Sequence, residues 1–153
     1  MTERLLHDLA LMVPETVVTV TIIAALVADI IFRRSRAIVP AIVLVGLTVA
    51  GIIVLGQPHE SFAIFSGMLA VDPFAGFFKV LILLSAILVV VFSLGFHELN
   101  ANGRKVGEYY TLIATLTLGM MLMAGANNML MMYLAIELSS ISSYALSGYT
   151  REA

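Results

Sequence analysis

Long runs of apolar residues dominate the sequence, and the longest of them exceeds what one membrane-spanning helix requires. Between Tyr109 and Tyr149 the only charged residue is Glu137. A continuous helix over this run would reach about 60 Å, whereas the hydrocarbon core of a bilayer is about 30 Å thick. The run must therefore turn back, and Gly125-Ala126-Asn127-Asn128 is the cluster of helix-breaking residues near its middle. We predict two antiparallel spans here, at 109–124 and 128–148.

Three further apolar runs precede this pair, at 11–32, 38–55 and 74–96, and each is long enough to cross a bilayer. The composition supports burial in lipid, since 61% of the residues are hydrophobic and 12% are charged, against about 45–50% and 25% in soluble domains. The segment 61–72 is expected to be a loop whose short apolar stretch lies along the membrane surface. We predict an all-α integral membrane protein, a single membrane domain over 1–153 with five spans.

The basic residues of the predicted loops are distributed unequally between the two sides of the membrane. If the spans alternate in direction, one side carries six of them and the other side carries only Arg4. Loops rich in lysine and arginine remain in the cytoplasm. We therefore expect the N-terminus outside and the C-terminus in the cytoplasm, in a bacterial inner membrane rather than an organellar one. The six residues are Arg33, Arg34, Arg36, Arg104, Lys105 and Arg151.

Composition also excludes several kinds of site. The chain has no cysteine, which rules out disulfides, iron–sulfur ligation and thiolate zinc sites. It has three widely separated histidines and neither a GxGxxG nor a Walker-type loop. A net charge of −2 offers no basic patch to a nucleic acid. We expect no cofactor and no metal on this chain, no nucleic-acid partner, and the lipid bilayer as its surroundings.

Glu137 is the residue most suggestive of function. It lies about nine residues into the fifth predicted span, near the middle of the bilayer, where an ionised carboxylate costs several kcal/mol. Tyr133, Ser140 and Tyr144 follow the helical spacing that places them on the same face. The pattern favours a proton-carrying acid on a polar relay face. The alternative is a protonated glutamate that only hydrogen-bonds a neighbouring helix.

Four other charged residues lie within or beside the spans. Lys79 is about five residues into the third span, so its ammonium either reaches the interface along its own stem, forms a structural pair, or meets Glu137 if those spans touch. Glu15 and Asp29 lie near helix ends and are expected to cap or anchor them. Asp72, directly before Pro73, is expected to be a helix N-cap.

Small and flexible side chains gather in the last two spans. Gly119, Ala124, Gly125 and Ala126, together with the serines of 139–143, permit close approach of two helices. Six methionines lie in the same hairpin, and with no cysteine or histidine nearby they favour adaptable packing over a copper site.

The segment from Gly119 to Tyr149 resembles a known family in detail. It reads GMMLMAGANNMLMMYLAIELSSISSYALSGY. The elements G-M-x-L-M-x-x-A-N at 119–127 and Y-L-x-x-E-L-x-S at 133–140 are similar to the fourth and fifth helices of the antiporter-like subunit N of respiratory complex I, and to the equivalent mitochondrial subunit 2 and its plastid counterpart. Val13-Pro14-Glu15 and Phe77-Phe78-Lys79-Val80-Leu81 agree with the same family.

The resemblance implies a function and a set of partners. The acid of the fifth helix in this family belongs to the proton-translocation machinery, and it matches Glu137. The family implies a membrane arm whose other subunits surround the chain, with quinone, FMN and iron–sulfur clusters held on those other subunits. Members of the family are longer and continue into a broken helix that carries a lysine. The chain is therefore expected to be the N-terminal third of a longer subunit, inactive without its C-terminal portion.

Two other functions fit the same residues. Related cation/proton antiporter and membrane hydrogenase subunits commonly place an aromatic residue directly before the acid, where this chain has Ile136. A non-catalytic membrane scaffold or assembly factor would tolerate Gln or Leu in place of Glu137. The leading prediction is a membrane-arm subunit of NADH-quinone oxidoreductase that takes part in proton translocation.

Overall fold

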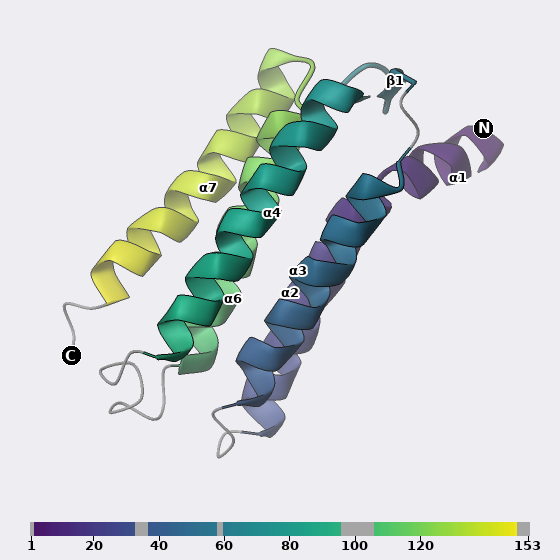
Figure 1. Cartoon of the computed structure of the whole chain (residues 1–153). Helices are drawn as coiled ribbons and strands as arrows, with labels where there is room; N and C mark the ends of the chain where they lie inside the picture. The colour runs from purple at the N-terminus through teal and green to yellow at the C-terminus, as the bar shows by residue number, and fades with distance from the viewer. Residues whose placement is uncertain (1, 33–36, 58–59, 96–105, 150–153) are drawn as a thin grey trace.

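The fold is a bundle of membrane-length helices, seen here in a computed structural model that describes residues 2–32, 37–57, 60–95 and 106–149 (Figure 1). Within these ranges, five helices are long and apolar enough to cross a membrane. They are α2 (Val13–Ile31), α3 (Ile38–Leu55), α4 (Pro73–Leu94), α6 (Val106–Ala124) and α7 (Met129–Tyr149). Their bounds confirm the predicted spans to within three residues, including the turn between α6 and α7.

A further helix, α1 (Thr2–Leu11), precedes the first span and leaves the bundle at an angle (Figure 1). The chain turns at Met12, and α2 begins with a proline in its first turn. Pro14 has no backbone N–H, so it fits the start of a helix better than its interior. The predicted span from residue 11 therefore begins at Val13, and the helix before it was not predicted from sequence.

Helix α6 occupies the centre of the bundle and packs against α2, α3, α4 and α7. Its side chains Tyr110, Ala114 and Met121 are almost completely buried. Helix α7 packs chiefly against α6 and has two buried residues, Ala135 and Ser142. Most of the α7 surface is therefore not covered by any other part of the chain that the structure describes.

The loop 61–72 contains a two-stranded hairpin that was not predicted. Strand β1 (Phe62–Ile64) pairs antiparallel with β2 (Leu69–Val71). The turn between them has positive φ at Phe65, Ser66 and Gly67. Its side chains Ile64, Leu69 and Val71 are buried against residues from α1, α6 and α7, including Leu11, Leu122 and Met131. The apolar side chains of this loop therefore pack against other parts of the chain at one end of the bundle.

The hairpin also holds the turn between α6 and α7. The Ala70 amide donates to the Gly125 carbonyl at 2.8 Å, and the Asn127 amide donates to the Met68 carbonyl at 3.0 Å. The Asn127 side chain donates to the Gly67 carbonyl at 3.1 Å. Asn128 accepts from the Met131 amide at 2.8 Å and so caps α7. These bonds give the asparagines of the 125–128 cluster a structural role.

Close contact between α6 and α7 depends on Gly119, as the small residues predict. A Cβ added there would lie 2.9 Å from the Ser139 backbone nitrogen and 3.3 Å from the Ala135 carbonyl oxygen. Both are backbone atoms of α7, so neither can move aside as the end of a side chain does.

We therefore predict that Gly119→Val destabilises the chain by about 1–3 kcal/mol, because overpacking forces the two helices apart. The measurement is the free energy of unfolding in detergent micelles. The matched control is Gly51→Val in α3, where an added Cβ meets nothing within 4 Å. Equal destabilisation by the two valines would contradict this account of the α6–α7 contact.

Candidate functional site

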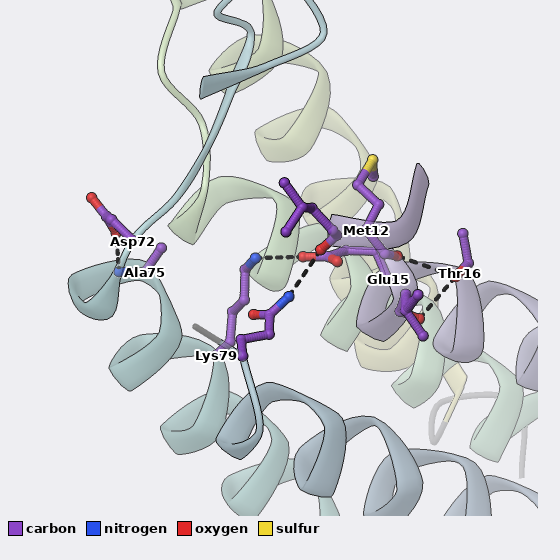
Figure 2. Close-up of polar contacts among 9 residues, drawn as sticks. Met12, Glu15, Thr16, Asp72, Ala75 and Lys79 are labelled. Atoms are coloured by element: carbon purple, nitrogen blue, oxygen red, sulfur yellow. Dashed lines mark hydrogen bonds and ion pairs between the residues drawn. The ribbon is translucent and has the colours of Figure 1, made fainter. Parts of the chain in front are cut away.

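A buried ion pair joins the first and third membrane-spanning helices. The ammonium nitrogen Nζ of Lys79 on α4 lies 2.6 Å from Oε1 of Glu15 on α2 (Figure 2). The two side chains are 4% and 6% exposed, respectively. Of the three expectations for Lys79, the structure therefore shows a structural pair, with Glu15 as the partner. The expected capping role of Glu15 is replaced by this pairing, although the residue does lie in the first turn of α2.

The cap of α4 and the spacing of buried residues along α4 and α2 explain why Lys79 and Glu15 point into the bundle. Asp72 caps α4, as predicted, and its Oδ1 accepts from the Ala75 amide at 2.6 Å (Figure 2). With the helix fixed at this end, Ala75, Lys79 and Leu83 follow at four-residue spacing and are all buried. On α2, Glu15 and Val18 form the start of the corresponding buried stripe. The two charges meet because the inward stripes of two helices bring them to the same end of the bundle.

The α6–α7 turn and the hairpin lie at the same end of the bundle as this ion pair, close to the stem of Lys79. A Cβ added at Gly125 would lie 3.7 Å from Cε of Lys79 and 3.1 Å from the Ala70 carbonyl, so the lysine stem runs close to both the turn and β2. At the same end, the Gln57 side-chain amide donates to the Leu11 carbonyl at 2.9 Å. The Phe65 amide donates to Asp8 at 3.1 Å, which ties the hairpin to α1. Hydrogen bonds therefore connect the segments at the end of the bundle where the ion pair lies.

Glu137, in contrast to the buried ion pair, lies on an exposed surface of the bundle. It is the ninth residue of α7, and its side chain is exposed on the face turned away from α6. Tyr133 and Tyr144 share that face and are 63% and 73% exposed, whereas Ser140 is half-buried at its edge. Within the described residues Lys79 forms its ion pair with Glu15, so the alternative contact between Lys79 and Glu137 is not formed.

The serines near Glu137 bond mainly within their own helix. Ser139 donates to the Ala135 carbonyl, Ser142 to Leu138 and Ser143 to Ser140, each at 2.9 Å. Such bonds to the preceding turn are the usual way for a helix to satisfy a buried hydroxyl. The proposed relay through Tyr133, Ser140 and Tyr144 stays a prediction, made on the face they share with Glu137.

Two buried polar contacts were missed in the sequence. One is the Glu15–Lys79 ion pair. The sequence feature that could have indicated it is the presence of two opposite charges at similar depth near the same end of their spans. The other joins α4 to α6, where the Ser93 and Tyr110 hydroxyls lie 3.1 Å apart and both residues are buried. Within the described ranges, no three His, Asp or Glu side chains group closely enough to hold a metal ion.

Removing one member of the ion pair should cost far more than removing both. We predict that Glu15→Gln or Lys79→Met each lowers the free energy of unfolding by about 3–5 kcal/mol, because the partner is left as a buried uncompensated charge. The double variant should recover most of this loss. Glu108→Gln, an exposed acid in the first turn of α6, is the control and should change stability by less than about 0.5 kcal/mol. Additive losses in the double variant would show that the two side chains do not interact.

Comparison with known proteins identifies the family. NADH-quinone oxidoreductase subunit N 2 of Chloroherpeton thalassium is 45% identical over 121 residues, covering 76% of this chain and 23% of that protein. Subunit N of an Anaeromyxobacter species is 37% identical over 147 residues, covering 90% of this chain and 27% of that protein. No protein-family model matches the chain.

A solved structure agrees with these relatives. A chain of respiratory complex I from Thermus thermophilus with bound aureothin superposes with a TM-score of 0.74 and 29% identity, covering 91% of this chain and 30% of that one. The chain thus spans between about a quarter and a third of the length of the proteins it matches. On this similarity of sequence and fold, the chain belongs to the family of subunit N of NADH-quinone oxidoreductase and corresponds to an N-terminal part of that subunit.

Proposed function

We propose that this chain is part of a membrane-arm subunit that takes part in proton translocation coupled to quinone reduction by NADH-quinone oxidoreductase. The observation that carries the proposal is Glu137, an acid midway along α7 on a face that the described chain leaves open. A carboxylate at that depth against lipid would cost several kcal/mol, so such acids face a partner or a water-filled path.

The uncovered face of α7 supports the idea that another segment of the complex packs against it. Tyr133 and Tyr144 flank Glu137 there, and both offer hydroxyls to a neighbouring surface. The matching proteins are longer than this chain, so they contain further segments that could cover this face. Such a segment carrying a cation would stabilise the ionised form of Glu137, and its withdrawal would favour protonation. Glu137 would then load and release a proton.

The remaining assignments follow from the family. Quinone, FMN and iron–sulfur clusters would be held by other subunits, and this chain would supply proton-carrying and packing residues without a redox centre. The chain would act together with the rest of its subunit and the other membrane-arm subunits. Its bacterial relatives favour the bacterial inner membrane.

The test of this function is Glu137→Gln in the assembled complex. The rate of proton transport should fall by at least about tenfold, since removing a positioned acid–base group costs roughly 10²–10⁴ in rate. The assay is acidification of vesicles measured together with quinone reduction, and assembly is checked by native gel electrophoresis. Glu108→Gln, the same change at an exposed site, should leave transport intact. Normal transport in Glu137→Gln would instead favour the scaffold role.

The proposed orientation can be tested with single cysteines, because the chain has none of its own. Ser66 lies exposed in the turn of the hairpin, and Ser35 belongs to the arginine-rich sequence after the first span. With the N-terminus outside, Ser66→Cys should react with a membrane-impermeant maleimide added to intact cells. Ser35→Cys should react only after the membrane is opened. The reverse pattern would show that the orientation is inverted.

A further inference from the structure

A buried carboxylate oxygen in the bundle lacks a hydrogen-bond donor within the described part of the chain. Glu15 meets Lys79 through Oε1, while Oε2 of the same carboxylate is buried and accepts no hydrogen bond there. An ionised carboxylate has room for about four hydrogen bonds. Leaving one of its oxygens bare inside protein costs free energy, so an occupant at Oε2 is expected.

The occupant could be a proton, a protein donor or a water molecule. A proton on Oε2 would neutralise Glu15 and leave the Lys79 ammonium as an uncompensated buried charge. The Gln57 amide, at the same end of the bundle, donates one of its two N–H groups to the Leu11 carbonyl at 2.9 Å, and its second N–H makes no hydrogen bond to Oε2. A water molecule needs at least two polar partners, and Lys79 supplies the second, because its ammonium has three N–H donors and Oε1 takes only one of them.

We propose that one ordered water molecule binds between Lys79 Nζ and Glu15 Oε2. It accepts a hydrogen bond from the ammonium and donates one to the carboxylate. Both oxygens of Glu15 are then satisfied, and the ion pair is joined directly on one side and through water on the other. This site is separate from Glu137 and does not depend on the proposed proton transport.

The direct test is a high-resolution map of the membrane complex that contains this chain. Density for a water should appear about 2.6–3.2 Å from both Glu15 Oε2 and Lys79 Nζ. In Glu15→Leu/Lys79→Met, which replaces the pair by apolar side chains of similar size, that density should be gone. An empty position in the unsubstituted protein, in a map that shows other buried waters, would overturn the proposal. A protein donor found at Oε2 would also overturn it.

Infrared spectroscopy gives a second, independent readout. The carboxylate stretching band of Glu15 is identified by its loss in Glu15→Gln, or in Glu15→Gln/Lys79→Met if the single variant does not assemble. The water is read from its own O–H stretching band, which should shift when H₂¹⁶O is replaced by H₂¹⁸O and should be lost together with the Glu15 band, whereas Glu108→Gln should leave it in place. The oxygen isotope is needed because the Lys79 ammonium, which bonds the same carboxylate, also exchanges its protons in D₂O. The absence of any ¹⁸O-sensitive band that is lost with Glu15 would mean that no water contacts the carboxylate.

Discussion

Inside a bilayer no bulk water is available to a polar side chain, and this constraint determines how each charge in the spans is placed. Lys79 and Glu15 satisfy it with each other at 2.6 Å and are both buried. Their pairing fixes the inward faces of α2 and α4 at the end of the bundle where the hairpin lies. Glu137 lies midway along α7 and is exposed, which is why we propose that it faces a partner beyond the described residues.

The two acids therefore have different relationships to the rest of the chain. Glu15 is paired within this chain with Lys79, whose stem runs close to the α6–α7 turn and β2. Glu137 lies on a helix that is held chiefly by α6, through close contact at Gly119. Helix α7 is positioned at its start by Asn128 and by the bonds from the hairpin to Gly125 and Asn127. These contacts hold α7 in a defined position on the bundle.

Hydrophobic patterning predicts much of this fold because lipid imposes a length on each span. The five spans and the break at 125–128 follow from run length and from the helix-breaking residues alone. Asp72 followed by Pro73 predicted the start of α4 because capping is a local interaction. The hairpin was not predicted, since its stability comes from buried contacts with α1, α6 and α7 that are distant in the sequence.

Charge pairing was harder to predict for the same reason. Position along each span indicates the depth of Lys79, Glu15 and Glu137, but not which helices are neighbours. The hypothesis that Lys79 meets Glu137 required α4 and α7 to touch at that point, whereas the bundle brings Lys79 to α2. The most direct test of the proposed role of Glu137 is to determine, in a structure of the assembled complex, which groups surround its carboxylate. We predict a lysine or arginine from outside residues 1–153 within about 4 Å of it, and a carboxylate facing lipid acyl chains would contradict the account.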